Sequence, residues 1–397
     1  MIKTISLTIC LLTFVSFSQS QQPSALLLNE TYLSALKEKV KKKDPAVIAL
    51  VENLEQQAQK LVDMKPVSVM DKTILPPSGN KHDYMSQAPY FWYDSSKPNG
   101  LPYLRRDGQR NPEINKITDR SNLGKLDEST RILSLAYFLT GKEAYAAKSA
   151  GLLKAWFINE DTKMNPHLEY GQGIPGINTG RGIGIIETVA LTGIADAVLL
   201  LKGSPSWKSA DDKAVKNWYA KYLDWLLTSK YGIDEHNTKN NHATWYYAQT
   251  IDFALFTGDK EKAITLVNES KKRLDSQINK EGKMQLELDR TNGLGYSSMN
   301  IQGWFRVATL ANLVGIDLWN YKTPEGVGIK TALDWLLPYA TGEKKWEYEQ
   351  ISPYNKTALY SLLLQAKNIW KDPQYPTLIA QLRRETADKI AELQYGN

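Results

Sequence analysis

Two short stretches of the chain carry the side chains best suited to chemistry. They are Lys239-Asn240-Asn241-His242-Ala243-Thr244-Trp245-Tyr246, and Glu287-Leu288-Asp289-Arg290-Thr291 followed by Tyr296. Asn241, His242, Arg290 and Tyr296 together offer an amide, an imidazole, a guanidinium and a phenol. The chain has 4 histidines in all, so few imidazoles compete with His242 for a role in proton transfer.

These four groups match the needs of β-elimination in a uronic-acid polymer. Removing H5, next to the carboxylate carbon, creates an enolate-like dianion that needs donors or cations at the carboxylate. Asn241 and Arg290 can supply them, with His242 as a further donor, and the guanidinium fork matches a carboxylate. Tyr296 can protonate the leaving O4, and as a phenolate it can also remove H5. Arg290 is expected to lower the pKa of this phenol toward working pH.

The configuration of the sugar decides how many proton-transferring residues are needed. In β-mannuronate H5 and O4 leave from the same side, so Tyr296 can act as both base and acid. In α-guluronate they leave from opposite faces, so His242 would be the base and Tyr296 the acid. Both residues are present, which is compatible with cutting either sugar.

Each residue also has an ordinary structural explanation. Asn240 and Asn241 could cap a helix, and Arg290 could pair with Glu287 one turn back. His242 and Tyr296 could be hydrogen-bonded structural residues. The joint occurrence of the four groups favours the catalytic interpretation.

The start of the chain has the pattern of a secretory signal peptide. Lys3 precedes an apolar run that ends in small residues, and cleavage is expected after Ser20. The single cysteine, Cys10, lies in this run, which excludes disulfides and cysteine nucleophiles from the mature chain. Residues 1–20 are thus predicted to be a signal peptide of a periplasmic or secreted protein, and residues 21–397 a single domain.

Charge and aromatic content agree with an anionic polysaccharide as substrate. The net charge is +6, and the chain has 11 Trp and 21 Tyr, whose rings can stack on sugars. Nucleic acid is a poorer partner, because the sequence has no dense basic stripe. No stretch after the signal peptide looks long and apolar enough to span a membrane, so no membrane anchor is expected. The usual spacings of metal-binding His and Asp are missing, so no metal or other cofactor is expected.

Helical periodicity dominates the chain and predicts an all-α fold. One helix is expected to start at Asp44-Pro45. Further helices are expected at approximately 122–139, 142–158, 182–202, 208–229, 242–256, 259–277, 299–315, 328–339, 355–368 and 375–393. The passages 137–144 and 253–260 resemble each other, since each ends one helix at Thr-Gly and starts the next. Repeated antiparallel helix pairs of this kind build an incomplete (α/α) toroid or barrel around one cleft.

Two long segments, 65–120 and 164–181, interrupt the helical pattern. Loops of this length in a compact domain are usually functional, so we expect them to form walls of the cleft. The residues expected to grip sugars from these walls are Tyr84, Tyr90, Trp92, Gln172 and Arg181. Rings suit sugar stacking, and Arg181 suits carboxylate pairing.

A wider set of motifs extends the two reactive stretches. It comprises Asn240-Asn241-His242-x-x-Trp245, Glu287-x-x-Arg290-Thr291, Tyr296, His82-Asp83-Tyr84-Met85-Ser86-x-Ala88-Pro89-Tyr90-x-Trp92, Lys97-Pro98-x-Gly100-Leu101-Pro102-Tyr103, Gln172 and Gly180-Arg181-Gly182-x-Gly184. In these motifs the chain resembles the alginate lyase superfamily of α/α-toroid fold, in particular its secreted Bacteroidetes-type members. The resemblance covers nearly the whole mature chain and implies Asn241, His242, Arg290 and Tyr296 as the catalytic set.

One departure from the family pattern concerns the polymer. The spacing from Arg290 to Tyr296 is one residue shorter than in the better-known alginate lyases of the superfamily. In this respect the chain is similar to a related branch that includes glucuronan lyases. That branch implies Glu235, seven residues before His242, as a further site residue, and Trp245 joins the residues expected at the substrate.

The leading interpretation is a polysaccharide lyase that cleaves 1,4-linked uronic-acid polymers and leaves 4,5-unsaturated oligosaccharides. Alginate is the favoured substrate, with glucuronan or another polyuronate as the alternative. An inverting glycoside hydrolase on the same scaffold would need two carboxylates roughly 6.5–9.5 Å apart, for which Glu187 and Glu235 are candidates. A non-catalytic polysaccharide-binding protein would need the aromatic residues but not His242 and Tyr296 together.

Overall fold

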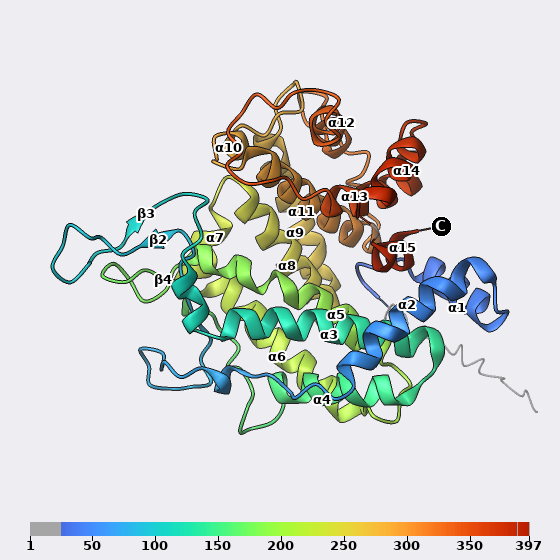
Figure 1. Ribbon diagram of the computed structural model, residues 1–397, viewed down its shortest axis with the longest axis horizontal. Coiled ribbons are helices and arrows are strands. Elements are labelled where there is room, and N and C mark those ends of the chain that lie inside the picture. Colours follow the sequence, from blue (N-terminus) through green and yellow to red (C-terminus); the bar gives the residue numbers. More distant parts are fainter. Residues whose placement is uncertain (1–24, 387, 397) are drawn as a thin grey trace, which may run out of the picture.

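The computed structural model describes residues 25–386 and 388–396, and helices make up most of its regular structure (Figure 1). The helices are α1 (Glu30–Lys41), α2 (Pro45–Leu61), α3 (Asp119–Thr140), α4 (Glu143–Phe157), α5 (Ala190–Leu200), α6 (Ser209–Thr228), α7 (Lys230–His236), α8 (Asn241–Thr257), α9 (Lys260–Gln277), α10 (Gln285–Leu288), α11 (Gly293–Leu313), α12 (Ile329–Ala340), α13 (Thr357–Trp370), α14 (Tyr375–Thr386) and α15 (Lys389–Tyr395), with 3-10 turns η1 (Val69–Asp71), η2 (Pro112–Lys116) and η3 (Gly182–Val189). The predicted signal peptide lies outside the described residues.

Pairs of consecutive helices pack against each other, as the sequence predicts. Helix α3 packs on α4, and α8 packs on α9. Each pair is joined at a glycine in the left-handed region, Gly141 at φ 73° and Gly258 at φ 91°, where the missing Cβ lets the chain turn sharply. The predicted Thr-Gly helix ends and the all-α fold are confirmed.

Two predicted helices differ from the expected ones. The segment 182–202 begins as η3 and becomes α5 only at Ala190, because its glycines lie against other backbone. A Cβ on Gly184 would come within 2.6 Å of the Gly171 carbonyl, so this part of the chain is held close to the loop before it. The segment 375–393 forms two helices, α14 and α15. The short helices α1, α7 and α10 were not predicted.

The segment Gly182–Leu200 also corrects the expectation that no further stretch has the length and apolarity of a membrane span. It meets both conditions, but 72% of it is buried inside the protein. Apolar side chains on all faces are expected of a helix in the centre of a fold. This segment therefore has the properties of a core element.

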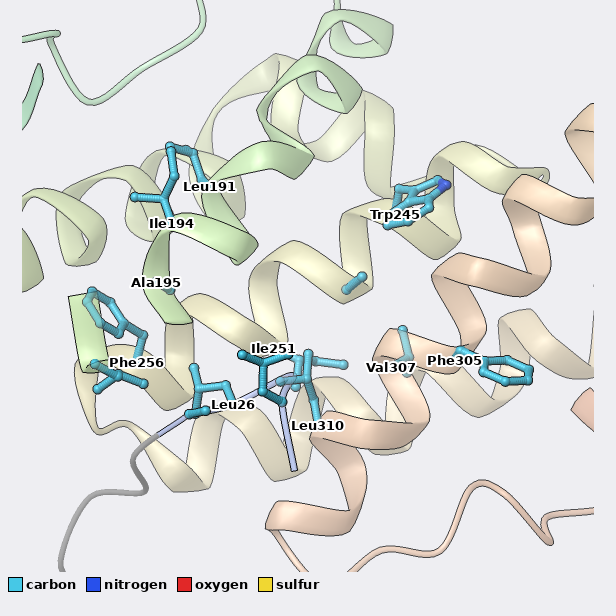
Figure 2. Close-up of a cluster of buried hydrophobic side chains, with 14 of the residues drawn as sticks. Leu26, Leu191, Ile194, Ala195, Trp245, Ile251, Phe256, Phe305, Val307 and Leu310 are labelled. Atoms are coloured by element: carbon cyan, nitrogen blue, oxygen red, sulfur yellow. The ribbon is translucent and has the colours of Figure 1, made fainter. Parts of the chain in front are cut away.

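The inner helices of the fold are α8 and α11, which pack on each other and are buried along most of their length. Figure 2 shows side chains of this core, among them Ile251 of α8 and Leu310 of α11, with Leu26 of the N-terminal segment close to both. Asp196 of α5 holds that segment, because its carboxylate accepts the backbone N–H groups of Leu26, Leu27 and Leu28. The N-terminal end of α8 and the start of α11 are thus placed by a rigid core.

The two long non-helical segments lie together. Strand β1 (Met85–Gln87) pairs in parallel with β4 (Tyr170–Gly173), and β2 (Phe91–Trp92) pairs antiparallel with β3 (Leu104–Arg105). Figure 1 shows these strands beside α7, at the end of the molecule away from α1 and α15. The segments expected to form cleft walls are therefore neighbours near one end of the inner helices.

Candidate active site

The N-terminal end of α8 presents His242. The Asn240 side chain accepts the backbone N–H of His242 and so caps the helix. Helix α7, just before it, places Glu235 so that its Oε1 lies 2.7 Å from His242 Nδ1. The Glu235 side chain is 1% exposed and that of His242 12% exposed. A carboxylate that accepts from Nδ1–H selects the tautomer with a lone pair on Nε2, which can then take a proton.

Asn241 donates hydrogen bonds to a buried carboxylate and does not face the solvent. Its backbone N–H and its Nδ2 each donate to Glu287, both at 2.6 Å, and it has no exposed surface. Burial raises the pKa of Glu287 to about 6, although the hydrogen bonds from Asn241 act in the opposite direction. The expectation that the Asn241 amide meets the substrate carboxylate is thus corrected for this arrangement, since the amide lies beneath the surface.

Tyr296 lies on the first turn of α11, between two polar partners. Arg290 Nη2 donates to its phenol oxygen at 2.9 Å, and the guanidinium carbon lies 3.9 Å from the ring centroid. The Tyr90 hydroxyl is 2.9 Å from the same oxygen. Burial, together with Tyr90, raises the pKa of Tyr296 well above its ordinary value, and Arg290 offsets only part of this. Arg290 lowers this pKa, as predicted, but burial of the phenol outweighs one cation. The phenol keeps its proton, as a proton donor must.

Arg181 is a partly buried cation beside the same site. Its Nη2 donates to Gln172 Oε1 at 2.7 Å, and its guanidinium lies 5.2 Å from the Phe91 ring centroid. Burial lowers the pKa of Arg181 to about 10, and the charge of Arg105 acts in the same direction. The next residue, Gly182, lies so close to Glu235 that a Cβ on it would be 3.1 Å from the Glu235 backbone nitrogen, which places Arg181 near the partner of His242. Its Nε is buried and has no hydrogen-bond partner in the described part of the chain.

The remaining aromatic residues divide into exposed and buried ones. Trp92 is partly exposed, donates to the Gln109 carbonyl and lies 5.4 Å from the guanidinium of Arg106. Tyr84 and Trp245 are 0% and 3% exposed. The expectation that these two contact sugars is corrected, because buried rings have no face to offer. Tyr84 instead donates to Glu187.

Several predicted residues are thus joined by a continuous series of contacts. Glu235 holds His242, and its neighbour Asn241 holds Glu287. The backbone N–H of Arg290 donates to the Glu287 carbonyl oxygen at 3.2 Å, and the Arg290 side chain donates to Tyr296. The structure therefore brings together the imidazole, guanidinium and phenol that the sequence singled out.

Asp107 is a residue of this site that the sequence analysis did not identify. Its carboxylate accepts from Nε and Nη2 of Arg290, at 3.0 and 2.8 Å. The signal available in the sequence was Arg105-Arg106-Asp107-Gly108, a dense charge cluster with a glycine inside a long loop. That signal carries no information about the partner, which lies 183 residues away.

The two glutamates that an inverting hydrolase would need are both engaged elsewhere. Glu187 accepts from Tyr84 and Ser86 and has a side chain with 0% exposure. Glu235 is bound to His242. Neither carboxylate is free to flank a glycosidic bond.

Comparison with known proteins defines the class. The family model described as alginate lyase matches residues 68–346. The crystal structure of an alginate lyase from Bacteroides ovatus is 38% identical, covers 94% of this chain and 98% of its own, and superposes with a TM-score of 0.89. The structure of alginate lyase A1-III from a Sphingomonas species is 16% identical, with 89% and 90% covered and a TM-score of 0.57. A variant of alginate lyase A1-III complexed with tetrasaccharide is 15% identical, with 91% and 92% covered and a TM-score of 0.60.

A comparison with curated proteins gave no match. The two A1-III structures, at their low identity, show the fold alone, and they confirm the predicted incomplete α/α toroid. The Bacteroides ovatus structure and the family model show more. The chain belongs to the alginate lyase family. It is a polysaccharide lyase, which overturns the alternatives of a glycoside hydrolase and a non-catalytic binding protein.

Proposed function

We propose that this protein cleaves 1,4-linked uronic-acid polymers by β-elimination, with alginate as the first candidate substrate. The similarity to the Bacteroides ovatus alginate lyase supports this choice. The observation that carries the mechanism is the pair of proton-handling groups within one series of contacts. His242 has Nε2 free to accept a proton, and Tyr296 keeps its own proton.

In the proposed reaction H5 passes to His242 Nε2, and its electron pair forms the C4–C5 double bond. The C4–O4 bond breaks, and O4 takes the proton of Tyr296. These protonation states suit a guluronate link directly, because that link needs one residue as base and another as acid. For mannuronate or glucuronate links, where H5 and O4 leave from one side, Tyr296 has to release its proton first. The Tyr90 hydroxyl, 2.9 Å away, is a path for that proton.

The carboxylate that activates H5 needs a positive group beside it. Arg181 is suited to this role, because it is a partly exposed cation whose Nη2 is held by Gln172 and whose neighbour Gly182 lies against Glu235, the partner of His242. A charge-assisted hydrogen bond in such a place is stronger than a neutral one. Trp92 and Arg106, exposed near one another on the loops, are suited to sugars farther along the polymer.

The start of the sequence supports a proposal for where the enzyme acts. The signal-peptide pattern of residues 1–20 supports a periplasmic or secreted enzyme, and an extracellular polymer is a substrate that such an enzyme meets. Export of the full-length chain in a Gram-negative host, followed by sequencing of the mature N-terminus, tests this part of the proposal.

The reaction itself is tested on purified polymannuronate, polyguluronate and glucuronan, with a neutral glucan as control. Elimination creates an ultraviolet-absorbing double bond for each new reducing end. We expect absorbance and reducing ends to rise together on at least one polyuronate and neither to rise on the glucan. Reducing ends without absorbance, or no reaction on any polyuronate, would refute the proposal.

A further inference from the structure

The loop after β3 contributes a carboxylate to the reactive cluster. Asp107 Oδ2 accepts from Arg290 Nε at 3.0 Å, and Oδ1 accepts from Nη2 at 2.8 Å. Two parallel hydrogen bonds between a carboxylate and one edge of a guanidinium determine the orientation of the guanidinium plane as well as its position. Because Asp107 and Arg290 are far apart in sequence, this contact also ties the loop to the segment before α11.

Asp107 is itself held firmly. Arg105 Nη2 donates to its Oδ1 at 2.8 Å, and Thr291 Oγ1 donates to its Oδ2 at 3.2 Å. Gly108 follows at φ +71°, and a Cβ at this position would collide with Thr291 Oγ1. The loop backbone therefore approaches the Arg290-Thr291 segment as closely as a glycine allows.

This pairing changes what Arg290 can do. A guanidinium has two edges that match a carboxylate, and Asp107 already occupies the one formed by Nε and Nη2. Nη2 also donates to the Tyr296 oxygen, and the guanidinium lies over the Tyr296 ring. The guanidinium is thus directed at the phenol.

We propose that Asp107 is a positioning residue for the elimination. It holds the Arg290 guanidinium against Tyr296, so that the guanidinium stays hydrogen-bonded to the phenol and does not bind the substrate carboxylate. The inference rests on the proposed function and deepens it, since it leaves the substrate carboxylate to Arg181.

The charges around the phenol agree with this role. The charged and titratable groups that act on Tyr296 are Tyr90 and Asp107, which raise its pKa, and Arg290, which lowers it. Burial would raise the pKa of Asp107, but hydrogen bonds from Arg290 and Arg105 outweigh burial and hold it below its ordinary value. Asp107 is therefore ionised at working pH, and it balances the charge of Arg290 beside the phenol.

The test compares Asp107→Asn with Asp289→Asn. Asn has nearly the shape of Asp but lacks the charge and one acceptor. Asp289 is an exposed neighbour of Arg290 in sequence whose Oδ1 accepts from Gln285, so its variant is a matched control. We measure melting temperature, kcat, KM and the pH profile of kcat/KM on the polyuronate that the wild type cleaves best.

For Asp107→Asn we expect kcat to fall by roughly 100-fold, because a displaced catalytic group loses its alignment. KM should stay within about threefold, because the group does not bind substrate. The basic limb of the pH profile should move to lower pH, because Arg290 loses the negative charge that balances it beside Tyr296. The control variant should behave as the wild type.

Two results would overturn the inference. Unchanged kcat and an unmoved basic limb would mean that Asp107 only braces the loop. A lower KM with kcat retained would mean that Tyr296 works without Arg290 held against it, so that Asp107 is not a positioning residue of the elimination. If Asp107→Asn does not fold, Asp107→Glu, which keeps the charge but moves it, should lower kcat while the basic limb shifts less. A wild type without lyase activity would refute the proposed function, whereas an active wild type with an indifferent Asp107 would refute this inference alone.

Discussion

The contact between Glu235 and His242 yields a quantitative prediction. In the proposed mechanism the Glu235 carboxylate orients the imidazole and stabilises the imidazolium that forms when Nε2 takes H5. Glu235→Gln keeps the shape and one acceptor for Nδ1–H but removes the charge. A hydrogen bond to a charged group contributes about 1.5–3 kcal/mol, which corresponds to about 10- to 150-fold in rate. We expect a loss near the upper end, because Glu235 is 1% exposed and water screens it little.

The assay is the initial rate of ultraviolet absorbance on saturating polyuronate, with melting temperature as a check on folding. Asp234→Asn, at an exposed neighbouring position of α7, is the matched control and should keep the wild-type rate. A Glu235→Gln enzyme that folds normally and retains kcat within about twofold would refute the reasoning. His242 would then need no charged partner, and its role as base would lose its support.

Three further predictions concern other parts of the site. Arg181→Ala should raise KM about tenfold or more with a smaller fall in kcat, and weaken the salt dependence of KM; unchanged KM and salt response would place Arg181 outside the cleft. His242→Ala should abolish cutting of polyguluronate before that of polymannuronate or glucuronan, whereas equal losses would show that His242 mainly holds the carboxylate. Glu287 has a pKa of about 6, so its protonation below that pH removes an acceptor from Asn241, and kcat should fall as pH drops through about 6. Because the pKa of Glu287 is raised in the folded state, its protonation below pH about 6 stabilises the fold. A loss of kcat in this pH range without unfolding therefore supports a role of ionised Glu287 in the active site. A kcat that does not change with pH there contradicts this role.

Features of the fold that depend on residues close together in the sequence could be predicted, whereas those that depend on contacts between distant segments could not. The helix ends at Gly141 and Gly258 were predictable because a Thr-Gly stop is a local signal. The 3-10 start of the helix at Gly182 was not, because it depends on contact with Gly171 and other backbone brought close by folding. Amphipathic periodicity likewise does not report where a helix such as 375–393 breaks in two.

The reactive residues were predictable as types but not as partners. His242 and Tyr296 stood out because few chemistries need both, and Glu235 lies one short helix before His242. The pairing of Asp107 with Arg290 joins segments 183 residues apart. The sequence also does not tell how deeply each side chain is buried. Burial removes Tyr84 from the surface, and it raises the pKa of Tyr296 against the effect of Arg290.

The most direct test of the account is the Tyr296→Phe variant. Phe keeps the ring but removes the hydroxyl that is proposed to protonate O4, and general acid catalysis contributes about 10²- to 10⁴-fold. Tyr354→Phe, which removes a phenol bonded to Ser298 of the same helix, is the matched control. The account predicts that Tyr296→Phe loses at least about 100-fold in kcat while polymer affinity is retained, and that the control stays active. A Tyr296→Phe enzyme with near-normal turnover on every polyuronate would contradict it.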